Sequence, residues 1–263
     1  MTGRERIGIL TIVRNLSGGV ALFRKRLMAL QWNPERVMVA VVENDSEDDT
    51  LGHLLDWSRE DSRLLVATYN DRSPKGEEDI EGETRYRTRA RAKNYGLAML
   101  RTLEPDYILA IEADLLFGPD LLTALVERIE KLREPSVLAP LVVRSGDDET
   151  RAIEKKGFPI IDEKGDVVAY DTWGFRAPGQ GPHQPWPPQG RDGFVSMDSV
   201  GSCILFPAQP VLSFQPEDEI VGLCREARAK GMGVWYTSEV MVVHPWPPVP
   251  SVAALAPPEP EAK

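Results

Sequence analysis

The chain has 263 residues, of which 42% are hydrophobic and 27% charged, a composition typical of a globular domain rather than of a disordered chain. Its net charge of −10 argues against a general nucleic-acid binder, because such proteins neutralise phosphates with an excess of Lys and Arg. The two cysteines, Cys203 and Cys224, show neither a disulfide framework nor a zinc pattern. No stretch approaches the ~20 apolar residues of a membrane span, and the N-terminal apolar run is too short for a signal peptide. We therefore expect a cytoplasmic protein.

The first part of the chain alternates apolar runs with amphipathic segments. Buried strands are predicted at Ile7 to Val13, Val37 to Glu43 and Leu64 to Thr68, each followed by a helix or a loop. Ser46 and Asp49 are predicted to form a capping box that opens the second helix. Repeated strand–loop–helix units indicate an α/β fold with a mostly parallel central sheet and helices on both faces.

Polar residues gather where these strands end. Ligands of such sheets bind beyond the carboxyl ends of the strands. The residues that this rule places there are Arg14, Asn15, Glu43, Asp45, Glu112 and Asp114.

The basic segment RARAKNYGL lies on a helix predicted from about Thr88 to Arg101. On that helix Arg89 and Lys93 share one row, while Arg91 belongs to the neighbouring row. Several cations on one half of a helix suit a diphosphate, although a solvated charged face is the simpler interpretation.

The segment YILAIEADLLFGPD combines a short apolar strand, Tyr107 to Ile111, with two acids, Glu112 and Asp114. Two carboxylates at the end of a buried strand are costly unless a positive group lies between them, and a divalent cation bridging to a phosphate would supply it. Alternatively, one acid caps the next turn and the other is solvated.

The second half of the chain is less regular. Residues 177–190 are too rich in Pro and Gly for helix or central strand and predict a loop. The aromatic residues in or beside it are Trp173, Phe175 and Trp186, which either stack on a sugar or fasten the loop to the core.

Later segments return to regular structure. A strand is predicted at Ser202 to Phe206, and a helix opens near Glu219. Two short strands follow, at Val234 to Tyr236 and Val240 to Val243, and His244 after the second is either a metal ligand or a surface residue.

Four motifs in this order resemble the GT-A superfamily of nucleotide-sugar glycosyltransferases, in particular its family-2-like members. VVENDSEDDT is similar to the second-strand nucleoside motif, and RARAKNYGL to the Ala-Arg-Asn-x-Gly helix. IEAD stands in the place of the DxD metal motif, with Glu112 for the first Asp. The segment from Glu219 to His244 is similar to the late helix–strand–His region. A partial similarity to the Anp1/Mnn9 mannosyltransferase group rests on VLAPLVVR, YDTWGF and MDSVGSCILFPAQPV.

The resemblance implies a single domain over residues 1–250, with a nucleotide-binding half at about 1–120 and an acceptor half at about 121–250. Residues 251–263 would form a Pro/Ala-rich disordered tail. It further implies a divalent metal, Mn²⁺ or Mg²⁺, a GDP- or UDP-sugar donor and a hydroxyl acceptor.

The resemblance also assigns roles to residues. The metal ligands would be Glu112, Asp114 and His244, and the acceptor site would contain Trp173, Phe175 and Trp186. Acceptor binding or general base catalysis would fall to Glu219, Asp218 and Asp198. The nucleotide sugar would be bound by Thr11, Val13, Arg14, Asn15, Glu43, Asp45, Arg91, Lys93, Asn94, Glu112 and Ala113.

Two other classes compete with this interpretation. A nucleotidyltransferase also uses a parallel sheet and a metal, but Ser17-Gly18-Gly19 is a poor version of its Gly-rich phosphate loop. The other is a non-catalytic binding protein on the same scaffold, which the presence of Asp114, Glu219 and His244 disfavours. The sequence leaves open whether the anomeric centre is inverted or retained.

Overall fold

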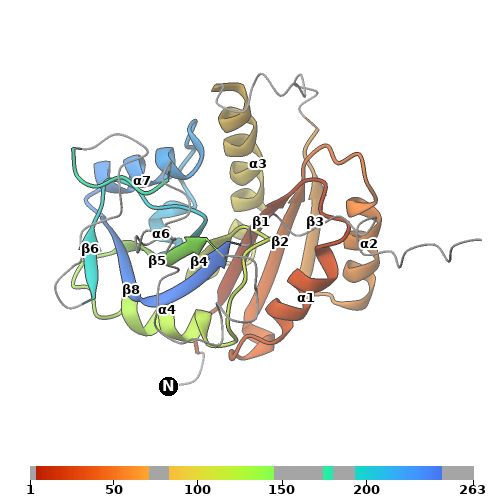
Figure 1. The fold of residues 1–263 in the computed structure, drawn as a ribbon, viewed down its shortest axis with the longest axis horizontal. Helices are drawn as coiled ribbons and strands as arrows, with labels where there is room; N and C mark the ends of the chain where they lie inside the picture. The colour runs from red at the N-terminus through yellow and green to blue at the C-terminus, as the bar shows by residue number, and fades with distance from the viewer. Residues whose placement is uncertain (1–3, 71–82, 145–173, 180–192, 245–263) are drawn as a thin grey trace, which may run out of the picture.

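One mixed sheet of eight strands organises the described part of the computed structural model, residues 4–70, 83–144, 174–179 and 193–244 (Figure 1). The strand order across the sheet is β3-β2-β1-β4-β7-β5-β8-β6. The strands are β1 (Ile7–Val13), β2 (Val37–Glu43), β3 (Leu64–Thr68), β4 (Tyr107–Ile111), β5 (Ser136–Arg144), β6 (Phe194–Ser196), β7 (Cys203–Pro207) and β8 (Gly233–His244).

Most strands of this sheet run in one direction. β1 is parallel to β2 and β4, β2 is parallel to β3, and β5 is parallel to β8. β7 is antiparallel to β4 and β5, and β6 is antiparallel to β8, so β6 and β7 alone run against the others in this sheet. The predicted α/β fold with a mostly parallel sheet is therefore confirmed.

Helices cover both faces of the sheet, as the sequence predicts (Figure 1). α1, α2 and α4 pack on one face, where Phe23 of α1 meets Trp57 of α2 edge to face with ring centroids 6.4 Å apart. α3, α6 and α7 pack on the other face, where Leu97 and Leu100 of α3 are buried against the strands. The helices are α1 (Val20–Met28), α2 (Thr50–Glu60), α3 (Glu83–Arg101), α4 (Leu121–Ile129), α6 (Ala208–Val211) and α7 (Glu219–Ala229), with a 3-10 turn η1 (Pro34–Arg36).

A glycine of α3, Gly96, lies at the contact between this helix and the sheet. A Cβ on Gly96 would lie 2.2 Å from Cδ1 of Leu10 and 3.1 Å from Cγ2 of Val42, so any other residue here would force these side chains to shift. The N-terminal half of α3 continues beyond the edge of the sheet (Figure 1). The basic residues of that half therefore stand over the edge where the parallel strands end.

Several predicted boundaries need correction. The capping box is wrong: Asp49 is the N-cap of α2 without a side-chain capping bond, and Ser46 Oγ instead accepts a hydrogen bond from the N–H of Asn15. The two short strands predicted before His244 form one strand, β8, whose register against β5 shifts between Pro140 and Leu141. α3 begins at Glu83 rather than near Thr88, and β6 had no sequence signal.

The remaining expectations concern the C-terminal tail, the two halves of the domain and membrane-spanning helices. The predicted tail, residues 251–263, lies outside the described residues. The division into a nucleotide half and an acceptor half stays a prediction. Within the described ranges, no helix has the length and apolar character needed to cross a membrane.

Candidate functional site

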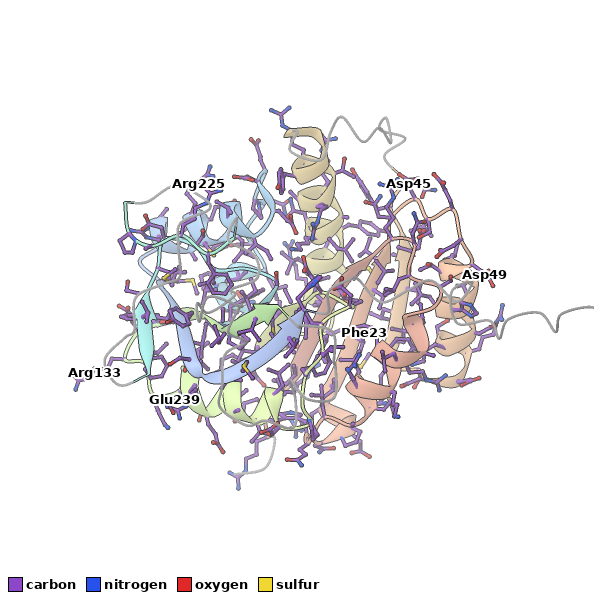
Figure 2. All side chains as sticks on the ribbon, viewed as in Figure 1. Phe23, Asp45, Asp49, Arg133, Arg225 and Glu239 are labelled. Atoms are coloured by element: carbon purple, nitrogen blue, oxygen red, sulfur yellow. The ribbon has the colours of Figure 1, made fainter. Side chains whose placement is uncertain are left out.

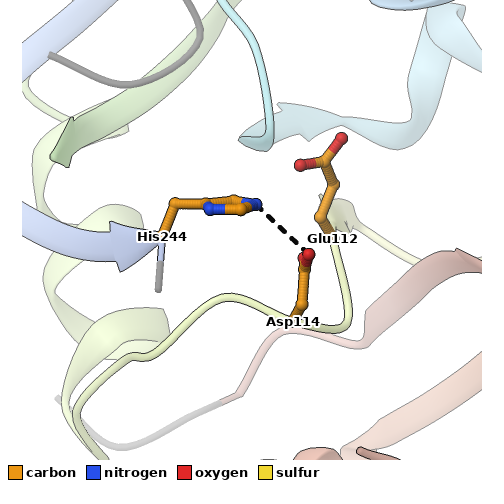
Figure 3. Close-up of side chains that lie close together, drawn as sticks. All are labelled: Glu112, Asp114 and His244. Atoms are coloured by element: carbon orange, nitrogen blue, oxygen red, sulfur yellow. Dashed lines mark ion pairs between the residues drawn. The ribbon is translucent and has the colours of Figure 1, made fainter. Parts of the chain in front are cut away.

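The loop after β4 brings three predicted metal ligands together. Although β7 and β5 separate β4 from β8 in the sheet, Leu116 and Val243 exchange backbone hydrogen bonds of 2.7 and 2.9 Å. This bridge fastens the loop to the end of β8. As a result, Oδ2 of Asp114 lies 3.2 Å from Nε2 of His244, with Glu112 beside them (Figure 3).

The donor atoms of this cluster suit a divalent cation. One ligand atom each from Glu112, Asp114 and His244 lies within 4.8 Å of the others. The Asp114–His244 distance is near the ~3 Å expected between neighbouring ligands that are each about 2.1 Å from one ion. Two carboxylates with an imidazole form a donor set that first-row divalent metals accept.

Asp114 is held in its ionised form. Burial raises its pKa, but the hydrogen bond and charge of His244, with a smaller effect of Arg89, outweigh burial and leave the pKa below its usual value. A partly shielded carboxylate that stays anionic is the state that a cation requires.

A row of cations on α3 connects this cluster to α7. Nη2 of Arg89 lies 2.7 Å from Oε1 of Glu112 and 3.0 Å from Oε1 of Glu219. Nζ of Lys93 lies 2.5 Å from the same oxygen of Glu219.

Arg91, which the resemblance assigns to the phosphates, is exposed on the neighbouring row. Arg89 was missing from the predicted site, although its i, i+4 spacing from Lys93 was a signal for it.

Glu219 begins α7 and points toward α3. Its residue is 8% exposed, and its backbone has a φ of 35°, in the left-handed region that favours glycine. Asn94 of α3 donates from Nδ2 to the carbonyl of Pro216 at 3.1 Å, which ties the start of α7 to α3. Glu219 therefore lies at the edge of the core, largely shielded from solvent.

The other two predicted acids lie elsewhere. Asp218 pairs with Arg225 at 3.0 Å on the outer side of α7. Asp198 pairs with Arg228 near the end of α7 and accepts a hydrogen bond from the N–H of Gly179 at 2.8 Å. Since Arg228 lies nine residues after Glu219, about 14 Å along a helix, the structure does not bring Asp198 to Glu219.

The loops after β1 and β2 form a second polar region at the same edge of the sheet (Figure 2). The N–H of Asn15 donates to Ser46 Oγ, and Oδ1 of Asn15 accepts from the N–H of Glu47 at 2.8 Å. Glu43 is buried and accepts from the N–H of Ser46 at 2.6 Å. Asn15 and Asp45 both have left-handed backbones, with φ of 51° and 53°. The two loops are therefore held together as one unit.

The remaining predicted nucleoside residues differ in exposure. Thr11 and Val13 are buried, and Arg14 is exposed. Oγ1 of Thr11 is buried with no hydrogen-bond partner among the described residues. Ala113 is buried between Glu112 and Asp114. These positions leave the assigned binding roles as predictions.

Of the predicted acceptor aromatics, the structure describes one. Phe175 is half-buried and packs edge to face on Tyr236, with ring centroids 6.2 Å apart. This contact favours the alternative in which the ring fastens its segment to the core. Trp173, Trp186 and most of the loop at 177–190 lie outside the described residues.

No family model matches the sequence, and no curated protein matches it. Among solved structures, the chain is similar to the mannosyltransferase PcManGT from Pyrobaculum calidifontis in complex with GDP-Man and Mn²⁺, with a TM-score of 0.57 and 14% identity over 96% of this chain and 60% of that one. The chain has the GT-A fold.

Two further structures support this assignment. They are S. aureus TarS 1–349 with UDP-GlcNAc, at a TM-score of 0.55 and 12% identity over 95% of this chain and 61% of that one, and the same protein with UDP, at 0.51 and 11% over 91% and 60%. The chain thus spans about three fifths of the length of these structures, and at such low identities the likeness concerns the GT-A fold alone.

Proposed function

We propose that the protein is a metal-dependent glycosyltransferase that moves a sugar from a GDP- or UDP-sugar to a hydroxyl acceptor. The observation that carries this proposal is the cluster of Glu112, Asp114 and His244 at the carboxyl edge of a GT-A sheet, with Arg89 beside it. The ligands named for the similar structures, GDP-Man with Mn²⁺ and UDP-GlcNAc, support this class of donor.

Glu112, Asp114 and His244 would hold Mn²⁺ or Mg²⁺. When bound there, such an ion neutralises the charge that develops on the departing diphosphate. Arg89 and Lys93 lie beside the cluster and would add positive charge from the α3 side. The alternation of acids and cations suits a ligand that carries a metal and several phosphate oxygens.

The nucleoside would lie over the loops after β1 and β2. In the sheet β1 separates β2 from β4, so the ends of β2 and β4 are about 10 Å apart. That span suits a nucleoside whose base and ribose rest near Asn15, Glu43 and Asp45 while its phosphates reach the metal cluster. The unpartnered Oγ1 of Thr11 is one further polar atom at this end of β1.

Glu219 is the favoured general base for the acceptor. In an inverting reaction the acceptor oxygen bonds to the anomeric carbon, the bond from that carbon to the phosphate oxygen breaks, and the acceptor proton passes to the carboxylate. Glu219 is the one predicted catalytic acid that the described contacts link to the metal cluster, through Arg89. Asp198 and Asp218 are the next candidates. A retaining outcome, as in the Anp1/Mnn9 group, would need a different role for Glu219.

Hydrolysis and transfer with a panel of nucleotide sugars test this proposal. With Mn²⁺ and GDP-mannose or UDP-GlcNAc, we expect slow release of GDP or UDP that Asp114→Asn abolishes. Asp120→Asn is the matched control, because Asp120 is an exposed acid six residues later. Release of pyrophosphate from a nucleoside triphosphate and a sugar phosphate would instead indicate a nucleotidyltransferase. Binding without turnover of any donor would indicate a non-catalytic binding protein.

A further inference from the structure

Glu219 is bound by the two cations that a diphosphate would require. Its Oε1 lies 2.5 Å from Nζ of Lys93 and 3.0 Å from Nη2 of Arg89. The side chains of Glu219 and Lys93 are only 9% and 11% exposed, so solvent screens this contact less than it screens a surface ion pair.

Arg89 also touches the candidate metal site. The nitrogen that contacts Glu219 lies 2.7 Å from Oε1 of Glu112. A phosphate oxygen on an ion held by Glu112 and Asp114 would therefore come within reach of this guanidinium. The ion would balance the two metal-site carboxylates, and the charges of Arg89 and Lys93 would then be shared between Glu219 and the phosphates.

We propose that Glu219 competes internally for the diphosphate site: it neutralises Arg89 and Lys93 in the nucleotide-free protein and is released when a diphosphate takes these cations. The inference rests on the proposed function and deepens it. A carboxylate held by two cations is a poor base, because its negative charge and lone pairs are already engaged. The acceptor hydroxyl would thus be activated only after the donor has bound.

The backbone at Glu219 is consistent with a held conformation. Its left-handed φ of 35° is unfavourable for a residue with a side chain and persists only where the surroundings enforce it. Contacts from α3 hold this part of the chain: the ion pairs of Arg89 and Lys93 with Glu219, and the hydrogen bond from Asn94 to Pro216. Release of the carboxylate would remove the first of these constraints.

Calorimetry of GDP, UDP and inorganic pyrophosphate with Mn²⁺ tests the inference. Glu219→Gln keeps the shape of the side chain and removes the competing charge, so we expect it to bind at least about fivefold more tightly than the parent, or about 1 kcal/mol. Glu217→Gln is the matched control, because Glu217 is exposed two residues away and the charge change is the same. Its affinity should stay within about twofold of the parent.

The outcomes separate the two proposals. If the parent binds nucleotide with Mn²⁺ and Glu219→Gln binds equally or more weakly, the inference is overturned while the proposed function stands. Equal tightening in Glu217→Gln also overturns it, because net charge would then explain the gain. If none of the three proteins binds a nucleotide or pyrophosphate, the proposed function fails and the inference fails with it.

A measurement on the parent protein avoids any effect of substitution on folding. Hydrogen exchange of peptides that cover residues 214–224 should become faster when GDP or UDP and Mn²⁺ saturate the protein, because the first turn of α7 loses its ion pairs to α3. Unchanged or slower exchange in these peptides, at saturation, would contradict release of Glu219.

Discussion

The contact between Lys93 and Glu219 should be measurable as a coupling free energy in the nucleotide-free protein. We consider Lys93→Met, Glu219→Gln and the double variant. Lys93→Met keeps most of the apolar stem of the side chain but leaves the carboxylate with one cation fewer, and Glu219→Gln leaves Lys93 without its charged partner. The double variant removes both consequences, so it should be more stable than the sum of the single effects predicts.

The structure sets the magnitude. Breaking a fully buried pair costs about 3–5 kcal/mol, because one charge is left without compensation. Here Arg89 still contacts the same carboxylate oxygen at 3.0 Å, and both side chains retain some exposure. We therefore expect Lys93→Met to lower the free energy of unfolding by about 2 kcal/mol, with a coupling free energy of about 1.5 kcal/mol between the two positions.

Urea unfolding at low ionic strength supplies the four free energies. The matched cycle is Arg225→Met with Asp218→Asn, since this pair has a similar separation, 3.0 Å, but side chains 70% and 35% exposed. Its coupling should stay below about 0.5 kcal/mol. A coupling of the same small size for Lys93 and Glu219 would refute the reasoning, because the carboxylate would then not be held by α3 in solution.

Three further predictions concern stability and reactivity. The side-chain hydrogen bonds of Arg63 lower the pKa of Asp61 to about 2, so its ionised form stabilises the fold above about pH 4 and this contribution is lost as the pH falls toward 2. Asp61→Asn should lower the free energy of unfolding at pH 7 by about 1–2 kcal/mol and flatten its decline in acid, as measured by urea unfolding between pH 5 and pH 2. Gly96→Ala should lower the melting temperature and cost about 1 kcal/mol, because the added Cβ crowds β1 by more than the gain in helix propensity; an unchanged melting temperature would contradict this. Burial raises the pKa of the thiols of Cys203 and Cys224, that of Cys224 to about 12, so a thiol reagent should label neither until denaturant is added.

The sequence predicts the sheet well where patterns are local. The apolar runs at Ile7 to Val13 and Tyr107 to Ile111 have the lengths and contents of buried strands, and both form strands with those bounds. Glu112 and Asp114 follow β4 directly. They therefore lie at the edge of the sheet where its parallel strands have their carboxyl ends. The prediction that Ser46 caps α2 was wrong because a serine hydroxyl can bond to a neighbouring loop as well as to the start of a helix. Here the hydroxyl of Ser46 accepts a hydrogen bond from Asn15 in the loop after β1.

The grouping of the site depends on contacts that no local pattern encodes. His244 reaches Asp114 only because Leu116 and Val243 are bridged across two intervening strands, over more than a hundred residues of sequence. In the same way, the choice between the Arg89 row and the Arg91 row of α3 is decided by which row faces the strand ends. Helical spacing defines the two rows but does not orient them.

In the proposed reaction, α3 would contribute both through its packing on the sheet and through its cationic side chains. Gly96 allows the helix to pack against Leu10 of β1, and Arg89 on the same helix contacts both Glu112, just after β4, and Glu219 at the start of α7. The proposed donor side and the proposed acceptor side of the site would thus be joined through one guanidinium on one helix. A phosphate that takes an N–H of Arg89 Nη2 would weaken the contact with Glu219, because this nitrogen carries only two N–H groups and already faces Glu112 and Glu219. The order in which the two substrates are engaged would then follow from the packing of α3 on the sheet, without a separate regulatory element.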